Sequence, residues 1–343
     1  VSAMLQPGLA ARWGVGTAHG RGVAIAGGGG DNAASAVGMG GNNFSRPKTA
    51  TETLQGSTEV IHAAIDAGIT FFDGADIYGS VIGRSEEFLG AALKGRRDRI
   101  VLSTKFGFAG NDAYPGLDLG PNGGERYIRH AVEQSLRRLQ TDRIDLLQMH
   151  SPDPATPIAE TLRVLTDLVG QGKVRYVGNS NFSPAQIAEA DQVARADGFV
   201  RFASAQDEYS LLARGVEREV LPTVNRLGMG FLPYFPLYNG LLTGKYTAEG
   251  GQGRLSKIKP HLLAGVDWDR LSAYQRLCDQ AGLTMLQATI SWLAAQPPVT
   301  TVIAGATRPE QARQNAAALL RLDDGLLQQI SDLFDLVKTL FSL

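Results

Sequence analysis

Residues 143–180 read RIDLLQMHSPDPATPIAETLRVLTDLVGQGKVRYVGNS, and this stretch decides the predicted fold. It starts and ends with short, nearly continuous apolar runs (143–150 and 173–180), which are typical of parallel strands buried on both faces. Residues 157–172 between them carry apolar side chains at helical spacing, at Leu162, Leu165, Leu168 and Val169. Glycines at 170 and 172 mark the end of that helix. The stretch therefore predicts one strand–helix–strand unit.

The same pattern recurs along the chain. Further strands are predicted at 37–41, 70–75, 99–106, 199–206, 229–235 and 299–305, with amphipathic segments between them. Eight strands, each followed by a helix over roughly 300 residues, favour a closed (β/α)8 TIM barrel over a doubly wound sheet. The chain also predicts a long loop after strand seven, at about 238–267, and an extra C-terminal helix from about Asp323. Long loops at the carboxyl ends of barrel strands usually carry function.

The first residues do not fit this pattern. Residues 1–34 are rich in Gly and Ala and have no sustained helical or strand period. Arg12 and Arg21 follow rather than precede the short apolar segment, so the order differs from that of a secretory signal. We therefore expect a poorly ordered leader at 1–34 and a single barrel domain at 35–343.

Composition excludes several classes of protein. With 33 Lys+Arg against 34 Asp+Glu, the net charge is -1, which gives no general attraction to nucleic acid or to anionic membranes. A single cysteine, Cys278, excludes an internal disulfide and a cysteine-based metal cluster. No apolar run reaches the about eighteen residues of a membrane span. We expect a cytoplasmic protein whose partners are neither nucleic acid nor membrane, and the sequence leaves its oligomeric state open.

Four polar residues follow adjacent predicted strands. Asp73 and Tyr78 come after the second strand, Lys105 after the third and His150 after the fourth. Taken singly, Asp73 fits a turn, Tyr78 a rim aromatic and His150 a hydrogen-bonded core histidine. Together they indicate a site, because the carboxyl ends of barrel strands meet at one mouth.

The chemistry of the four residues fits proton delivery to a carbonyl oxygen. A free tyrosine has a pKa of about 10, and a neighbouring ammonium at Lys105 should lower that of Tyr78. Asp73 would hold Lys105 charged, and His150 would polarise the carbonyl. None of these groups supplies a hydride, so a cofactor is required. A lyase or isomerase without nicotinamide leaves the polar residues at later strand ends unexplained, namely Ser180, Asn181, Gln206 and Tyr234. No histidine pair with metal-ligand spacing is present, and no metal is predicted.

Several segments resemble the aldo-keto reductase family. They are FFDGADIYGSVIGRSEEFLGAALKGRR (71–97), VLSTKFG (101–107), RIDLLQMHSPDP (143–154), KVRYVGNSNFSPAQI (173–187) and VIAGATRPEQARQN (302–315). The resemblance runs from about Val37 to the C-terminal helix, with the motifs in family order. Two further segments are most similar to the bacterial, general-stress-like and channel-β-subunit-like branches of this family, namely PYFPLYNGLLTGKY (233–246) and GATRPEQ (305–311).

The resemblance implies a role for each matching residue. Asp73, Tyr78, Lys105 and His150 would be the catalytic tetrad, with Tyr78 the acid in reduction. Ser180, Asn181 and Gln206 would bond the nicotinamide carboxamide, and Tyr234 would stack on its ring. The remaining cofactor contacts would be Gly41 and Asn42 at the ribose, Leu237, Asn239, Gly240 and Lys245 at the pyrophosphate, and Gly305, Thr307, Arg308, Gln311 and Asn315 at the adenosine.

The predicted helix start at Thr307–Pro309 supports the adenosine site. Free N–H groups and the helix dipole there favour a phosphate, and Arg308 adds a planar cation suited to a 2′-phosphate. NADPH is therefore preferred over NADH, while the alternative for Arg308 is a solvated surface charge.

The sequence departs from the family at three places. Gly74 replaces a threonine or serine, which could loosen the strand end beside Asp73. Asp207 replaces an asparagine beside Gln206, and no hairpin that would plug the barrel floor is recognisable before Ser35.

Two functions follow from these predictions. The first is NADPH-dependent, reversible reduction of small-molecule aldehydes and ketones to alcohols. The alternative is an NADPH-binding, redox-sensing regulatory subunit with slow turnover. Candidate substrate-lining residues are Asn43, Phe44, Phe106, Phe108, Tyr114 and Tyr238, of which Phe106 and Phe108 could equally be packing residues.

Overall fold

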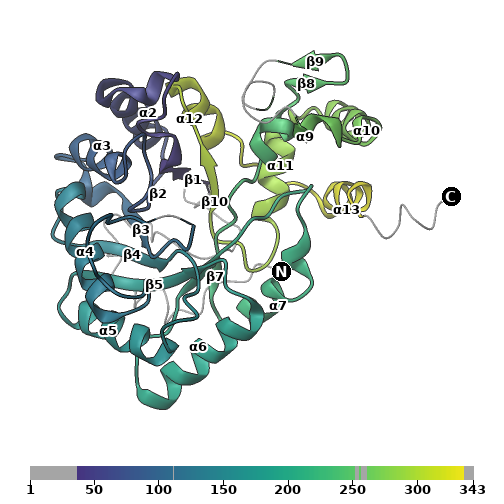
Figure 1. Ribbon diagram of the computed structural model, residues 1–343. Coiled ribbons are helices and arrows are strands. Elements are labelled where there is room, and N and C mark those ends of the chain that lie inside the picture. The colour runs from purple at the N-terminus through teal and green to yellow at the C-terminus, as the bar shows by residue number, and fades with distance from the viewer. Residues whose placement is uncertain (1–36, 111, 252–254, 256–260, 336–343) are drawn as a thin grey trace.

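Eight parallel strands form one sheet in this computed structural model, which describes residues 37–110, 112–251, 255 and 261–335 (Figure 1). The strands are β1 (Val37–Gly40), β2 (Phe71–Asp73), β3 (Val101–Phe106), β4 (Ile144–Met149), β5 (Val174–Ser180), β6 (Ser204–Gln206), β7 (Gly230–Phe231) and β10 (Val302–Gly305). Their order is β10-β1-β2-β3-β4-β5-β6-β7. The predicted leader, residues 1–34, lies outside the described residues.

Backbone hydrogen bonds close this sheet into a barrel. The Phe231 N–H donates to the Pro298 carbonyl at 3.1 Å, and the Thr300 N–H donates to the Phe231 carbonyl at 2.9 Å. One step further along, the Ile303 N–H donates to the Pro233 carbonyl at 3.0 Å. These bonds join β7 to the segment that leads into β10, so the predicted (β/α)8 barrel is confirmed.

Several strands are shorter than the apolar runs that predicted them. The run at 199–206 contains only β6 (204–206), and the run at 229–235 contains only β7 (230–231). Phe202 and Leu232 are buried although they lie outside these strands. Apolar sequence reports burial rather than ladder hydrogen bonding, which explains the overestimate.

Helices surround the barrel (Figure 1). They are α2 (Leu54–Asp66), α3 (Arg84–Ala92), α4 (Glu125–Leu139), α5 (Ile158–Gly170), α6 (Pro184–Asp197), α7 (Val220–Arg226), α11 (Met285–Ala294) and α12 (Pro309–Ala316). The loop after β7 contains the 3-10 helix η6 (Tyr238–Thr243), the antiparallel pair β8 (Tyr246–Thr247) and β9 (Gly250–Gly251), and α9 (His261–Ala264). It leads into α10 (Trp268–Gln280). The predicted terminal helix is α13 (Asp324–Leu333), with Asp323 as its side-chain cap.

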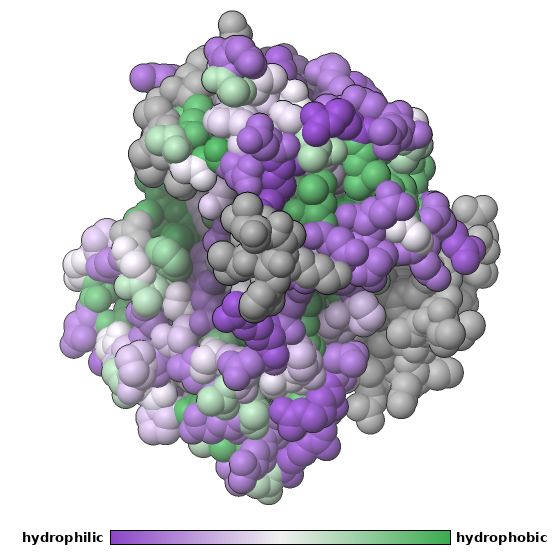
Figure 2. Space-filling model, turned by 90° about the vertical axis from the view of Figure 1, so that its right-hand side faces the viewer, coloured by the Kyte–Doolittle hydropathy of each residue, from purple (hydrophilic) through white to green (hydrophobic). Residues whose placement is uncertain are grey.

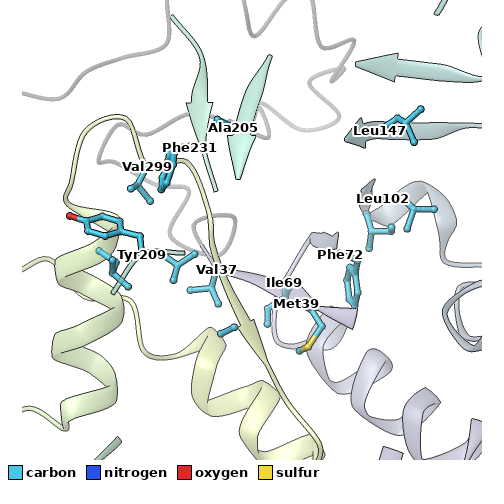
Figure 3. Packing of buried hydrophobic residues seen from close by; sticks show 14 of the residues in the cluster. Val37, Met39, Ile69, Phe72, Leu102, Leu147, Ala205, Tyr209, Phe231 and Val299 are labelled. Atoms are coloured by element: carbon cyan, nitrogen blue, oxygen red, sulfur yellow. The ribbon is translucent and has the colours of Figure 1, made fainter. Parts of the chain in front are cut away.

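The strands bury apolar side chains on both faces. Figure 3 shows residues of the larger cluster, among them Met39, Phe72, Leu102, Leu147 and Phe231, from neighbouring parts of the barrel. A second, separate cluster consists of Phe71, Leu146, Leu232 and Ile303, with Val101 and Tyr176 packed against it. Neighbouring strand residues point to opposite faces, so Phe71 and Phe72, or Leu146 and Leu147, belong to different clusters.

This alternation positions the site. Two residues beyond Phe71 on the same face lies Asp73, and two beyond Leu146 lies Gln148. The same face of β3 carries Val101, then Ser103 and Lys105. The barrel interior is thus apolar toward the amino ends of the strands and polar toward their carboxyl ends.

On the side where α10 and α13 lie, hydrophilic residues make up much of the surface, and hydrophobic residues show in patches between them (Figure 2). Across the described ranges, every helix is too short or too polar to cross a bilayer.

Candidate active site

A buried ion pair lies at the centre of the site. Lys105 is 0% exposed and Asp73 is 3% exposed, and the Lys105 Nζ donates to Asp73 Oδ2 at 2.5 Å. The same ammonium donates to the Gly74 carbonyl at 2.9 Å. Burial by itself would lower the pKa of Lys105, but the attraction of Asp73 and Tyr78 outweighs burial and raises it. Lys105 is therefore a permanent cation near neutral pH.

Three neutral donors surround the other oxygen of Asp73. The Ser103 hydroxyl donates to Oδ1 at 3.2 Å, Gln148 Nε2 at 3.3 Å and Gln206 Nε2 at 3.2 Å. Ser103 and Gln148 were not among the predicted site residues. The signal was available, because each is a polar residue two positions before a predicted site residue, and a period of two places both on one strand face.

Gln206 also contacts the ion pair. Its amide nitrogen bonds to Asp73 and to Gln148 Oε1 at 3.4 Å, so the side chain braces the ion pair at the cavity wall.

Gly74 does not loosen the strand end. Its N–H donates to the Ser103 carbonyl at 2.8 Å, and its carbonyl accepts from Lys105. A Cβ at this position would lie 3.3 Å from the Thr104 hydroxyl oxygen. Both backbone polar groups of Gly74 are therefore tied to β3.

Tyr78 lies above the ion pair, with the Lys105 ammonium 5.3 Å from its ring centroid. The predicted net lowering of the Tyr78 pKa is wrong. Burial is the largest effect and raises the pKa above 10, while Lys105 opposes it and Asp73 adds to it. The contribution of Lys105 has the predicted sign, but desolvation of the phenolate outweighs it. Tyr78 is consequently a protonated phenol at neutral pH, which is the form that an acid needs.

His150 is a neutral imidazole. Burial, reinforced by the charge of Lys105, lowers its pKa to about 2. Its ring lies edge-on to Tyr78 with centroids 5.8 Å apart and packs against Phe108 at 4.8 Å. Its Nδ1 is buried and has no hydrogen-bond partner among the described residues. A neutral histidine beside a protonated tyrosine can polarise a carbonyl without competing for the proton.

Strands β5 and β7 contribute a hydrogen-bonded group beside His150. Asn181 has a left-handed φ of 61°, and its Nδ2 donates to the His150 carbonyl at 2.9 Å and to the Ser180 hydroxyl at 3.1 Å. The Tyr234 hydroxyl donates to Asn181 Oδ1 at 2.9 Å. Asn181 therefore links the Tyr234 ring to the strand end that carries His150.

One cavity of about 1590 Å³ adjoins this site. It exceeds the about 300–1,000 Å³ of ordinary small-molecule sites, which leaves room for a dinucleotide together with a substrate. Asp73, Tyr78 and His150 line it, while Lys105 lies buried behind them. The predicted cofactor residues also line it: Gly41, Asn42, Ser180, Asn181, Gln206, Tyr234, Leu237, Asn239, Gly240, Lys245, Gly305, Thr307, Arg308, Gln311 and Asn315.

The far end of the cavity suits phosphate groups. The backbone has positive φ at Phe235, Tyr238, Asn239 and Gly240, and a Cβ at Gly240 would lie 2.6 Å from the Lys245 ammonium. Burial, together with the charge of Arg308, lowers the pKa of Lys245. The positive charges of Lys245 and Arg308 repel each other, and an anion bound between them would relieve that repulsion. Asn239 Oδ1 is also buried here without a partner among the described residues; as an acceptor it suits a hydroxyl or amide donor of a cofactor rather than a phosphate oxygen.

Helix α12 starts at this end, as predicted. Arg308 is its N-cap and Pro309 its first residue. The Thr307 N–H and hydroxyl both contact Gln311 Oε1, at 2.9 and 3.1 Å. Asn315 Nδ2 reaches the Gly305 carbonyl at 3.4 Å and so links α12 to the end of β10.

Phe108, which packs against His150, also lines the cavity. Asn43, Arg46 and Lys48 from the segment after β1 line it as well, and Asn43 lies against Gly305. Phe106 is 1% exposed and belongs to the core, so of the two phenylalanines only Phe108 faces the cavity. Phe44 and Tyr114 are buried, and neither they nor Tyr238 line it.

The protonated phenol and the neutral imidazole beside a cavity of dinucleotide size cannot supply a hydride, which in nicotinamide-dependent oxidoreductases comes from the bound cofactor. The chain matches the sequence model of the Aldo/keto reductase family over residues 36–334, and it belongs to that family. It is an NAD(P)H-dependent oxidoreductase of the carbonyl-reducing type.

Individual relatives include both enzymes and channel subunits. L-glyceraldehyde 3-phosphate reductase of Escherichia coli K12 is 34% identical over 284 residues, covering 78% of this chain and 80% of that protein. A probable voltage-gated potassium channel subunit beta of Arabidopsis thaliana is 36% identical over 274 residues, covering 76% and 80%. The uncharacterized oxidoreductase YrpG of Bacillus subtilis is 36% identical over 289 residues, covering 80% and 86%.

Proposed function

We propose that this protein reduces aldehydes and ketones reversibly to alcohols with NADPH, and that Tyr78 is the proton donor. The observation that carries the proposal is the position of a protonated phenol and a neutral imidazole directly over the buried Asp73–Lys105 pair. When bound, the reduced nicotinamide supplies a hydride to the carbonyl carbon.

The residues of the chain supply the proton and stabilise the charge that its loss creates. His150, held neutral, donates a hydrogen bond to the carbonyl oxygen and orients it toward Tyr78. Tyr78 gives its proton to that oxygen and becomes a phenolate. The Lys105 ammonium stabilises the phenolate, and Asp73 keeps Lys105 charged and oriented. Asp73, Lys105 and His150 are buried and Tyr78 is half-buried, so these interactions are partly shielded from water and are stronger than in bulk solvent.

Tyr78→Phe tests the proton donor. We expect turnover to fall by about 10²–10⁴-fold, the usual contribution of a general acid, while NADPH binding stays within about twofold. Tyr238→Phe is the matched control, because it removes the same hydroxyl from a residue outside the cavity lining. Steady-state NADPH oxidation and fluorescence titration measure the two quantities. If Tyr78→Phe turned over at the wild-type rate, Tyr78 would not be the proton donor.

Arg308 supports the preference for NADPH over NADH, because it caps α12 where the helix start faces the cavity. Arg308→Ala should weaken NADPH binding roughly tenfold and NADH binding much less, since only NADPH carries the 2′-phosphate. The control is Arg313→Ala, which removes an exposed arginine of the same helix. Equal losses for the two cofactors would contradict a role at the 2′-phosphate.

The substrate panel should include phosphorylated aldehydes. One relative is named an L-glyceraldehyde 3-phosphate reductase, and the cations Arg46 and Lys48 line the cavity. A higher kcat/KM for a phosphorylated aldehyde than for an uncharged aldehyde of the same length would support a phosphorylated substrate. Equal values would favour uncharged carbonyl compounds.

The alternative function is a redox-sensing subunit that holds NADPH and docks on a partner protein. It is favoured by the similarity to a probable channel subunit beta. Rapid multiple turnover by the isolated chain would support the enzyme. A single slow turnover together with a stably copurifying protein would support the regulatory subunit.

A further inference from the structure

A second group of buried polar side chains lies next to the site and is not used by the mechanism above. Asp76 and Glu86 are both 0% exposed. Glu86 accepts hydrogen bonds from the Thr104 hydroxyl at 2.6 Å and from Arg138 Nε at 2.7 Å. Asp76 has weaker contacts. The Tyr114 hydroxyl is 3.5 Å from its Oδ2, and its Oδ1 has no hydrogen-bond partner among the described residues.

The charges of this group do not balance if both carboxyl groups are ionised. Arg138 neutralises Glu86 through a direct ion pair. Burial, and then the negative charge of Glu86, raise the pKa of Asp76 to about 8, and Arg138 offsets this only in part. Asp76 is therefore a neutral acid at pH 7, and its O–H is a donor inside the protein.

Asp76 belongs to the turn that carries the proton donor. Its N–H donates to the Lys105 carbonyl at 3.0 Å. The Tyr78 N–H donates to the Ala75 carbonyl at 3.1 Å, and the Ser85 N–H donates to the Tyr78 carbonyl at 3.1 Å. The turn is thus tied to β3 on one side and to α3 on the other, and the Asp76 side chain on it is fully buried, with the Tyr114 hydroxyl 3.5 Å from its Oδ2.

We propose that Asp76 is a positioning residue for proton transfer: as a neutral acid it supports the turn that presents Tyr78, and its ionisation slows reduction. This inference rests on the proposed role of Tyr78. Proton donation leaves a negative charge on Tyr78, and a second negative charge at Asp76 opposes it.

Several groups face Asp76 from the surrounding elements. They are Tyr78 on the same turn, Glu86 on α3, Arg138 and Tyr127 on α4, and Tyr114 in the loop after β3, while Asp73 on β2 and Lys105 on β3 lie next to Tyr78. Burial raises the pKa values of Tyr78, Tyr114 and Tyr127 above 10. Lys105 and Arg138 have raised pKa values as well. Among the groups of this set with shifted pKa values, Asp76 is the one expected to titrate between pH 7 and 9.

The test compares the pH dependence of hydride transfer in Asp76→Asn and the wild type. The single-turnover rate of NADPH oxidation is measured by stopped flow with excess carbonyl compound from pH 6.5 to 9. In the wild type we expect the rate to fall by about fivefold or more as pH rises through 8. In Asp76→Asn the side chain stays uncharged, so the fall over this range should be less than about twofold. Asp118→Asn, which neutralises an exposed carboxylate in the loop after β3, should keep the wild-type profile.

A superimposable profile for Asp76→Asn and the wild type would overturn the inference. A second variant tests the supporting role: Asp76→Leu should lower the single-turnover rate at pH 6.5 by about tenfold or more and change the NADPH dissociation constant by less than about twofold. An Asp76→Leu rate equal to that of the wild type would contradict positioning. Should Asp76→Leu not fold, the Asp76→Asn profile still decides. Full turnover in Tyr78→Phe would instead reject the proposed function, and this outcome is separate from either result at Asp76.

Discussion

Removing the lysine of the buried ion pair is the sharpest perturbation of this site. In Lys105→Met, Asp73 loses the ammonium that contacts it at 2.5 Å, and the Gly74 carbonyl loses a bond of 2.9 Å. Removing one partner of a buried pair typically costs about 3–5 kcal/mol, because the other charge stays buried without compensation. Asp73 keeps donors from Ser103, Gln148 and Gln206, so we expect the low end, about 3 kcal/mol.

The double variant Asp73→Asn/Lys105→Met separates the ion pair from simple loss of packing. It leaves no unpaired charge, so its cost should be smaller than the sum of the two single variants by about 2 kcal/mol or more. Equilibrium unfolding in urea at pH 7, followed by tryptophan fluorescence and far-ultraviolet circular dichroism, measures all four proteins. The Lys105→Met midpoint temperature should also fall by about 6 °C. Additive costs within about 0.5 kcal/mol would refute the reasoning, since independent sites add.

Three further predictions concern a histidine and two glycines. Because the pKa of His150 is about 2, the pH profile of kcat/KM for reduction should show no ionisation of His150 between pH 5 and 7. The His150→Gln variant should be slower but should have a profile of the same shape in this range. If the wild type shows a fall in kcat/KM at acid pH that the variant lacks, the imidazole is not neutral. Gly240→Ala should weaken NADPH binding roughly tenfold in fluorescence titration, because its Cβ would collide with the Lys245 side chain. Gly228→Ala is the control: Gly228 also has a positive φ but has open space around it, so NADPH binding should be unchanged. Gly90→Ala should destabilise the protein by about 1–3 kcal/mol in urea unfolding, because the Cβ would lie 2.5 Å from a backbone oxygen of α4. Gly170→Ala has open space around the added Cβ, so it should be neutral or slightly stabilising.

The strand-end residues of the site could be predicted because their placement depends on local pattern. Asp73 and Lys105 lie at the carboxyl ends of apolar strands and His150 directly follows one, and parallel strands of a barrel present their carboxyl ends at one mouth. The helix start at Arg308 was also predictable from Thr-Arg-Pro, since proline is favoured in the first turn.

Other parts of the site could not be assigned in this way. Asp76 reads as an ordinary turn residue in DGADIY, and nothing local shows that Glu86 and Arg138 will be buried beside it. Phe106 and Phe108 are alike in sequence, yet Phe106 enters the core and Phe108 faces the cavity. These outcomes depend on which helix and loop pack against the strand, over separations of tens of residues.

The sequence by itself determined the barrel, the order of its strands and the carboxyl-end location of Asp73, Tyr78, Lys105 and His150, because hydrophobic periodicity and strand direction are local properties. Only the tertiary structure decided the protonation states. The pattern predicts that Lys105 lowers the pKa of Tyr78, whereas in the folded protein burial outweighs that attraction and leaves Tyr78 and His150 both neutral. The physical reason is that desolvation depends on everything packed around a group, and that environment exists only once the barrel has closed.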